Sequence, residues 1–317
     1  MRRYVLKRIL WMIPVALGVA ILIFTILYFT PGDPAVMILG SSATLEDRLQ
    51  LRTQMGLEDP YIVQLLRFLK QTFLQFNLGT SYFTNKSVAE EIISRFPNTF
   101  YLAFGSMVLS CLVGIPLGIT AAVHQNRLGD RAAMVIALIG ISMPAFWVGL
   151  LLVMLFSLHL GWLPPSGIGS WKNFILPIIA TSLGGTANLA RLVRSSMLDV
   201  IRADYVTTAR AKGVNKNKSV WFHALPNALI PVITQVGTSF GKTLGGTIVV
   251  ETVFGIPGIG NYMLSAVNNR DYPIVQGCVV FLALAFSIVV LLVDIIYAYV
   301  DPRIKAQYEK ANGGKAA

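Results

Sequence analysis

The sequence predicts an all-α, polytopic membrane protein with six transmembrane helices. Of its 317 residues, 55% are hydrophobic and 13% are charged, whereas about 25% are charged in a typical soluble domain. The apolar residues also form long runs separated by charged segments. A bilayer core about 30 Å thick is crossed by runs of about 20 residues, and it offers backbone groups no water, so each run must be helical.

The first run, 9–29, follows a short basic start, MRRYVLKR. The run is longer than the apolar core of a signal peptide, which has about 7 to 15 residues, and no A-x-A cleavage pattern follows it. We therefore expect residues 1–30 to be a cytoplasmic N-terminus and a retained first span.

Residues 31–97 are too many for a simple connection, so we expect an extracytoplasmic helical insertion between the first two spans. Turn-forming residues punctuate it, namely the Pro-Gly-Asp-Pro stretch 31–34, Gly56, Pro60 and Gly79. Between these breaks, apolar side chains recur at helical spacing. They are Ile62, Leu65, Leu66, Leu69 and Phe73. The insertion should form a small helical cap.

The remaining runs predict a five-helix core over 98–300, followed by a cytoplasmic tail, 301–317. They lie near residues 99–123, 132–159, 174–193, 228–250 and 275–299. In a soluble protein, the net charge of +11 would suggest a nucleic-acid partner. Here the basic residues gather at the N-terminus, in the segment 195–226 and in the tail, so the positive-inside rule accounts for them. It places both termini in the cytoplasm and makes the lipid bilayer, rather than nucleic acid, the expected partner.

The cytoplasmic segment 195–226 is longer than a turn and too small to own a core, so it needs a partner surface. We expect one apolar helical face, a helix break and a second short apolar turn. The face consists of Met197, Ile201, Tyr205 and Ala209, the break is Gly213, and the second turn is 220–225, ended by Pro226. Small residues next to Arg210 and Lys212 would let a partner helix or groove approach closely. The alternative is a basic loop that sets topology and touches anionic lipid.

This segment resembles the coupling loop of ABC importer permeases, whose pattern is E-A-A, three residues, Gly, nine residues, I-x-L-P. Gly213, Leu225 and Pro226 fall at that spacing, with Ala209 at the third position. Thr207, Thr208 and His223 replace the Glu, the first Ala and the Ile. The form TARAKG followed by HALPNALIP is similar to that of the peptide and nickel subfamily.

Other motifs extend the resemblance over nearly the whole chain. They are TPGDPA (30–35), MGLEDPYIVQ (55–64), NLGTS (77–81), RFPNT (95–99), VVETVFGIPGIG (249–260) and VDIIYAYVDPRI (293–304). The sequence departs from the subfamily at Asn77, where an Asp is usual. The resemblance implies the type I ABC importer permease fold.

It also implies a permease subunit in a bacterial cell membrane that imports short peptides, or else nickel, a metal chelate or another small solute. The implied partners are a second homologous permease, two cytoplasmic ATPase subunits that bind ATP and Mg, and an extracytoplasmic solute-binding protein. This chain would bind no cofactor itself. The residues that would dock the ATPase are Tyr205, Thr208, Ala209, Arg210, Ala211, Lys212, Gly213, His223, Leu225 and Pro226.

No catalytic or metal site is expected in this chain. GTSFGKT (237–243) has three residues between its first Gly and the Gly-Lys pair, whereas a phosphate-binding loop needs four, and it lies inside an apolar run. ATP hydrolysis must then come from another subunit. His124, His159 and His223 are dispersed, with no Cys or carboxylate at metal-ligand spacing.

The fifth run is too polar to face lipid alone, so it should line a pathway or pack tightly against a partner helix. The pathway candidates are Gln235, Thr238, Ser239, Lys242 and Thr243. The packing candidates are Gly237, Gly241 and Gly245, which form a small-xxx-small ridge. One helix can do both on different faces.

Two other features leave alternatives open. Glu251, Phe254 and Pro257 belong to a Gly- and Pro-broken stretch that is either an outer gate or a loop that closes the bundle. Lys242 and Asp294 lie within spans and would suit a stand-alone secondary transporter, but their different depths argue against a direct pair. We expect Asp294 to anchor the last helix against an inner Arg, and Lys242 to snorkel outward. A non-transporting scaffold is the third class.

Overall fold

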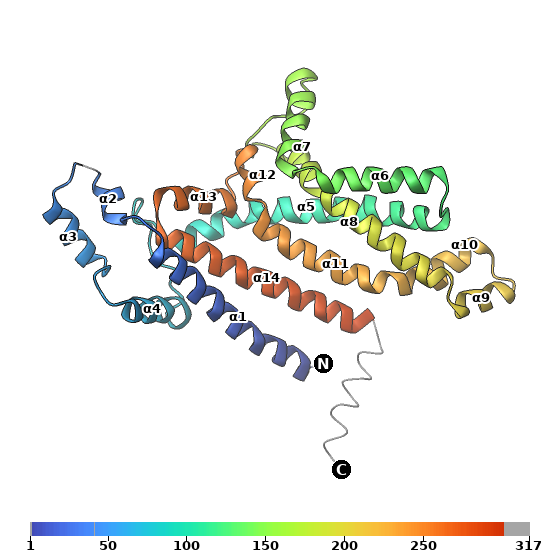
Figure 1. Cartoon of the computed structure of the whole chain (residues 1–317), viewed down its shortest axis with the longest axis horizontal. Coiled ribbons are helices and arrows are strands. Elements are labelled where there is room, and N and C mark those ends of the chain that lie inside the picture. Colours follow the sequence, from blue (N-terminus) through green and yellow to red (C-terminus); the bar gives the residue numbers. More distant parts are fainter. Residues whose placement is uncertain (1, 41, 301–317) are drawn as a thin grey trace, which may run out of the picture.

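The computed structural model describes residues 2–40 and 42–300, and its described secondary structure is helical apart from one isolated bridge between Thr80 and Ser87. The long helices are α1 (Arg2–Phe29), α5 (Val88–Val123), α6 (Leu128–Ser142), α8 (Ile175–Ile201), α11 (Leu225–Gly246) and α14 (Tyr272–Val300). They lie side by side with α5 running through the middle of the bundle (Figure 1). The all-helical class is therefore confirmed. The tail 301–317 lies outside the described residues.

Among the described residues, three helices are long and apolar enough to cross a membrane: Val5–Phe29, Val88–Val123 and Tyr272–Ile296. A fourth span results if the bent pair Leu128–Ser142 and Ala145–His159 counts as one. Helices α8 and α11 are long enough but more polar. Six spans therefore stay a prediction.

The expectation of one continuous helix over 132–159 was wrong. Helix α6 ends at Ser142, and α7 (Ala145–Leu152) with its π-helical continuation η2 (Val153–His159) starts again at an angle of 100°. The break lies at Met143, whose φ of −86° and ψ of 127° are extended. Pro144 follows it, and proline disfavours the helical conformation of the preceding residue and removes a backbone donor. Figure 1 shows α7 leaving the bundle almost at right angles.

Small residues let α5 and α8 pack backbone to backbone. A Cβ atom on Gly118 would lie 2.6 Å from the carbonyl oxygen of Ala190, and one on Gly114 would lie 2.8 Å from that of Thr186. Close approach of this kind drives helix association in lipid, where apolar side chains gain little from leaving the solvent. The tightly packed α5 and α8 pair is the frame on which the other elements sit.

The segment between α1 and α5 forms a helical cap, and its extracytoplasmic location stays a prediction. It contains α2 (Pro34–Leu39), α3 (Leu45–Gln54), α4 (Tyr61–Leu69) and the π-helical η1 (Lys70–Leu74), all gathered at one end of the bundle (Figure 1). Arg52 holds the cap together, because its guanidinium reaches Asp33 at 3.0 Å and Glu58 at 2.5 Å. The hydrogen bonds to these two carboxylates, to Glu58 first, raise the pKa of Arg52 above its ordinary value.

Two expectations for the cytoplasmic segment need correction. Met197 and Tyr205 do not share one helical face, because α8 ends at Ile201 and Ala203 is extended before α9 (Asp204–Ala211) begins. Pro226 does not end a turn; it stands in the first turn of α11, which continues η4 without a break. The break at Gly213 is confirmed, with a φ of +88°.

Candidate functional site

Helix α9 is the outermost element at the end of the bundle opposite the cap (Figure 1). After it come Gly213, the single turn α10 (Lys216–Lys218) and the π-helical η4 (Ser219–Ala224), which leads into α11. Asp204 stands in the first turn of α9, where a negative charge favours the helix dipole. We name the stretch 204–224 the inner loop.

The inner loop exposes most of the residues predicted to dock a partner. Seven of the ten are exposed: Tyr205, Thr208, Ala211, Lys212, Gly213, His223 and Pro226. Ala209, Arg210 and Leu225 are half-buried. Arg210 is turned toward its own loop, since its Nε donates to Ser219 Oγ at 3.3 Å. Most of the candidates are therefore accessible to a partner, whereas Arg210 contacts its own loop.

The inner loop is also packed onto the helix frame. Val206 of α9 and Val220 of η4 are buried in one apolar cluster, which we name the inner core. Its other buried members come from α5, α8 and α11 and from the end of η4. They are Ile119, Ala122, Leu189, Val193, Met197, Ala224, Ala228 and Val232. Helix α9 and η4 therefore share one buried cluster with three long helices.

A bidentate ion pair braces the same end. Arg194 of α8 donates from Nε to Asp130 Oδ1 at 2.6 Å and from Nη2 to Oδ2 at 2.7 Å. The backbone N–H of Asn126 also donates to Asp130 Oδ2, at 2.8 Å. Because the Asp130 side chain is almost fully buried, this pair holds the α5–α6 connection rigidly against α8.

Two aromatic residues of the inner loop were missed by the sequence reasoning. Trp221 is 54% exposed and Phe222 is 75% exposed, both on η4. Large aromatic side chains on an exposed surface are typical anchors of protein interfaces. The signal was an adjacent Trp-Phe pair within a basic loop, directly before the L-P motif.

A small cavity lies where α5, α8 and α11 meet, and because polar side chains form part of its largely apolar wall, we name it the polar cavity. Its volume is about 70 Å³, and Gln235, Ser239 and Thr243 of α11 line it. The opposite walls were not identified from the sequence; they include Ser106 and Ser110 of α5 and Thr181 and Asn188 of α8. Their signal was small polar residues inside otherwise apolar runs. Thr181 keeps a buried hydroxyl without a hydrogen-bond partner among the described residues.

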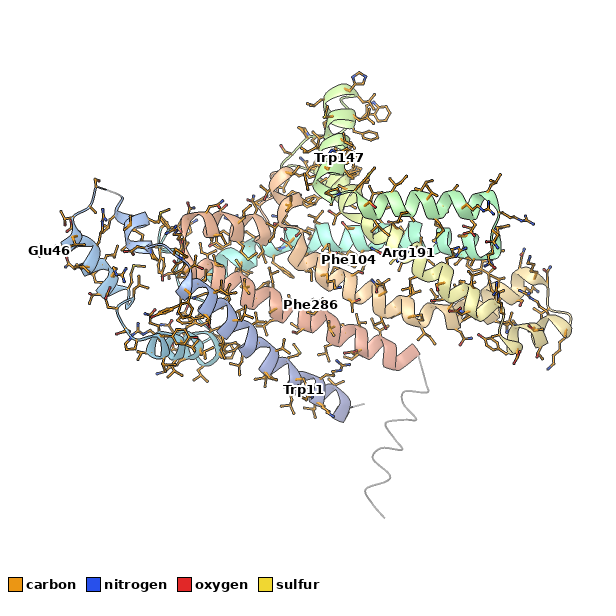
Figure 2. The ribbon with its side chains drawn as sticks, viewed as in Figure 1. Trp11, Glu46, Phe104, Trp147, Arg191 and Phe286 are labelled. Atoms are coloured by element: carbon orange, nitrogen blue, oxygen red, sulfur yellow. The ribbon has the colours of Figure 1, made fainter. Side chains whose placement is uncertain are left out.

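Helix α11 uses a different face for packing. A Cβ atom on Gly237 would lie 1.9 Å from Val293 Cγ2, and one on Gly241 would lie 2.6 Å from Phe286 Cδ2, both on α14. Figure 2 labels Phe286 between these helices. Gly245 has no such neighbour. Two of the three glycines therefore form the predicted ridge, on a face separate from the cavity wall.

The remaining pathway candidates, Thr238 and Lys242, do not line the cavity. Lys242 is exposed. Asp294 pairs with Arg8 of α1, with 3.0 Å between Oδ2 and Nη1. An Arg partner for Asp294 is confirmed, but it comes from the N-terminal helix α1 and not from a loop between spans.

The stretch proposed as a gate or a closing loop is well packed. It consists of α12 (Ile248–Val253), a turn with Gly255 at a φ of +58°, and α13 (Ile259–Asn269). Glu251 and Phe254 are buried and Pro257 is half-buried. We name the stretch 247–261 the outer turn. A gate function for it stays a prediction.

Glu251 is the centre of the outer turn. Its carboxylate accepts hydrogen bonds from Thr99 Oγ1 at 2.7 Å, from Thr247 Oγ1 at 2.8 Å and from the backbone N–H of Asn261 at 2.9 Å. Asn261 lies in the first turn of α13, where a carboxylate also favours the helix dipole. A fully buried carboxyl group thus joins α5, α12 and α13, and the salt bridges of the described residues do not include it.

A second buried carboxylate ties the cap to the last helix. Asp271 accepts from Ser81 Oγ at 2.6 Å and from the backbone N–H of Tyr82 at 3.2 Å. Burial, and next the charge of Asp271, raises the pKa of Tyr82 above its ordinary range, so this phenol stays neutral. The described residues contain no group of three or more His, Cys, Asp or Glu side chains that could hold a metal ion.

Two family models match the chain. The model of the binding-protein-dependent transport system inner membrane component matches residues 114–306. The N-terminal model of such membrane components matches residues 1–103. Together they take in the cap, the helix frame and the inner loop.

Curated relatives match over almost their whole length. The glutathione transport system permease protein GsiC of Salmonella typhimurium is 45% identical over 305 residues, which is 96% of this chain and 99% of that protein. The protein of the same name from Escherichia coli is 43% identical over the same shares.

Solved structures share the fold. The inward-facing MetNI methionine ABC transporter matches with a TM-score of 0.58 at 17% identity, over 67% of this chain and 96% of that chain. A second crystal form of it matches with a TM-score of 0.55 over 67% and 97%. At this identity the likeness concerns the fold alone.

Proposed function

The chain belongs to the family of binding-protein-dependent transport system inner membrane components, the permeases of ABC importers, and from that premise we propose that it forms half of a pathway for short peptides. A tripeptide of the glutathione kind is the first substrate to test, because relatives of this length and identity are named for glutathione. Nickel, a metal chelate or another small solute is the alternative.

The observation that carries the proposal is the connection between the inner loop and the cavity. Val206 and Val220 bury the loop in the inner core, which includes α5, α8 and α11. The same three helices line the polar cavity. Cytoplasmic ATPase subunits that bind ATP and Mg and then close would move α9, and α9 would move the cavity walls.

A second permease is part of the proposal because the cavity is too small alone. A volume of about 70 Å³ is well below the ~300 Å³ at which pockets for small ligands begin. A homologous subunit facing this wall would supply the other half. An extracytoplasmic binding protein would deliver the solute at the cap end.

The orientation follows from the charges. The inner loop contains the exposed Lys212, Lys216 and Lys218, and Arg8 lies on α1 beside Asp294. The positive-inside rule places these residues, and with them both termini, in the cytoplasm. Labelling of a single cysteine near either terminus in intact cells by an impermeant reagent would contradict this orientation.

The test of coupling is a pair of inner-loop variants in the complete complex reconstituted in liposomes. Ala209→Glu places a charge on the half-buried side of α9, and Gly213→Val places a β-branched residue at a φ of +88°. We expect normal membrane insertion but at least a tenfold loss of solute uptake per ATP hydrolysed. The matched control is Asn217→Ala on the exposed α10.

Each competing class gives a different result. Wild-type uptake in both variants would show that the loop does not dock an ATPase. Uptake that persists without the ATPase subunits would instead support a secondary transporter, and no uptake together with no stimulated ATP hydrolysis would support a scaffold. The substrate is identified separately, by mass spectrometry of the solute retained on the co-purified binding protein.

A further inference from the structure

The helix formed by α4 and η1 carries an apolar face that no described residue covers. Ile62 is 59% exposed and Leu66 is 61% exposed. Leu69 and Phe73 continue the same stripe at helical spacing and are half-buried. Beyond them, Leu74 is 74% exposed and Phe76 is 85% exposed. Such a stripe on an otherwise polar cap needs a partner of its own.

The other faces of this helix fix its rotation. On one side, Gln64 Nε2 donates to the carbonyl oxygens of Leu57 at 3.0 Å and Asp59 at 2.7 Å. Arg67 forms an ion pair with the carboxylate of Asp59. On the bundle side Phe68 stacks on Phe24 of α1 with 5.6 Å between ring centroids. The apolar stripe is therefore held away from both the cap and α1.

The contacts with α1 also fix the depth of the helix. Tyr61 meets the outer end of α1, with its hydroxyl 2.8 Å from Thr25 Oγ1 and its ring 5.1 Å from that of Tyr28. All aromatic contacts of α4 with α1 fall within 24–29, which is about 7.5 Å of helix. The candidate span Val5–Phe29 has 25 residues, or about 37 Å, whereas the hydrocarbon core is about 30 Å thick. The last turns of α1 therefore lie at the membrane boundary.

At that depth, the neighbouring surface of α1 faces lipid. Leu22 and Ile26 of the span are exposed and adjoin the segment that α4 contacts. The stripe of α4 thus continues a lipid-facing surface beyond the end of the span. Tyr28 and Tyr61 at the junction match the aromatic belt found at membrane interfaces.

We propose that α4 and η1 lie in the outer headgroup region of the bilayer and anchor the cap to phospholipid. Helices of this kind bury their apolar face about 5–10 Å into the boundary between headgroups and acyl chains. Lys70 is exposed beside the stripe and can extend its ammonium to the lipid phosphates. The anchor fixes the height of the cap above the membrane, independently of which solute is carried.

The test measures the depth of single cysteines in the complete complex in lipid nanodiscs. Cys111 and Cys278, the free cysteines of the described residues, are first replaced by Ala. A fluorophore is then attached at Leu66→Cys, at Leu22→Cys as the lipid-facing control, or at Glu46→Cys on the far edge of the cap (Figure 2) as the water-facing control. Lipids with a nitroxide near the headgroup and dissolved iodide serve as quenchers.

We expect nitroxide-lipid quenching at Leu66→Cys within about twofold of that at Leu22→Cys and several-fold above that at Glu46→Cys, with the reverse order for iodide. Adding Ile62→Asp should at least halve the lipid quenching at Leu66→Cys, whereas Gln50→Asp on the exposed side of α3 should leave it unchanged. Quenching of Leu66→Cys by iodide alone would overturn the anchor. Shielding from both quenchers would also overturn it, since a protein would then cover the stripe.

Discussion

The outer turn and the inner loop share a local design but differ in burial. Each is a short helix, a break at a glycine with positive φ, and a further helix: α12, Gly255 and α13 outside, and α9, Gly213 and η4 inside. In the outer turn, the carboxylate of Glu251 accepts three hydrogen bonds at zero exposure. In the inner loop, a Cβ atom on Gly213 would meet nothing within 4 Å.

This difference shows which region is stabilised by contacts within the chain and which region leaves surface for a partner. The outer turn buries the carboxylate of Glu251 with its hydrogen-bond partners, and most of its residues are buried or half-buried. The inner loop buries only a narrow apolar edge around Val206 and Val220, and it leaves Trp221 and Phe222 exposed. Mutations should therefore act on folding at one end and on assembly at the other.

The largest effect on stability is expected for Glu251→Ala. The change leaves the hydroxyls of Thr99 and Thr247 and the N–H of Asn261 without their acceptor. A buried group left unpaired costs about 1–3 kcal/mol, and there are several, so a loss of about 3 kcal/mol or more is expected. The loss is measured as the Tm in detergent by circular dichroism.

The isosteric variant Glu251→Gln serves as its control. It retains an acceptor for part of the network and should lose less than Glu251→Ala. A Tm for Glu251→Ala equal to that of the unmodified protein would show that the outer turn is not held by its carboxylate.

A pair of glycine variants compares the two regions directly. Gly258→Ala places a Cβ atom 2.4 Å from Glu251 Cδ, in a buried network that cannot yield. Overpacking of this kind costs about 1–3 kcal/mol. A Cβ atom at Gly213 would contact no other atom, so Gly213→Ala has only a backbone cost. The left-handed φ of Gly213 should lower the free energy of unfolding by about 1–2 kcal/mol at most.

We therefore expect Gly258→Ala to lower the Tm further than Gly213→Ala. The φ of Gly258 is −96°, so its penalty comes from packing alone. The reverse order of the two melting temperatures would contradict the assignment of a closed outer turn and an open inner loop.

The smallest effect on stability, with a large effect on assembly, is expected for Trp221→Ala and Phe222→Ala. Exposed residues outside special contacts usually change stability by about 0.5 kcal/mol or less. Aromatic anchors at an interface cost about 2 kcal/mol or more when truncated, which corresponds to at least about a 30-fold loss of affinity. The affinity is measured by pull-down, in which increasing amounts of detergent-solubilised permease are added to immobilised ATPase subunits and the bound fraction is recorded.

Asn217→Ala, on the exposed α10 of the same inner loop, is the control because Asn217 is not among the predicted docking residues. Unchanged ATPase binding in both aromatic variants would assign Trp221 and Phe222 to the lipid surface instead.

The fold class, the helical cap and the inner loop could be predicted from the sequence because each depends on a pattern along the chain. Apolar runs must become helices in lipid, and a glycine that directly follows basic residues at the end of a helical pattern, as Gly213 does, is a typical helix stop. The 100° bend after Ser142 was missed even though Pro144 was visible. A proline in an apolar run can also lie within a continuous helix, as Pro116 does in α5. Whether the helix breaks at a proline or continues through it therefore depends on the tertiary contacts around it.

Only the α11 wall of the cavity could be predicted from the sequence, because only there do polar residues form a visible pattern along the chain. Gln235, Ser239 and Thr243 stood out because polar residues are dense on one run. Ser106 and Thr181 are isolated on theirs, and only the packing of α5 and α8 through Gly114 and Gly118 brings them to the same cavity. Glu251 was singled out by its charge, but its partners lie about 150 positions away at Thr99 and ten positions ahead at Asn261.

By itself, the sequence determined that this chain is a set of apolar helices with a basic loop on one side, because hydropathy and charge act on each segment separately. The tertiary structure alone decided which face of each helix is buried. It turned one face of α11 to the cavity and another to α14, closed the outer turn on Glu251 and left the inner loop open. Those outcomes depend on close contacts between distant residues, and close contacts are set by shape and hydrogen-bond geometry that a linear pattern does not contain.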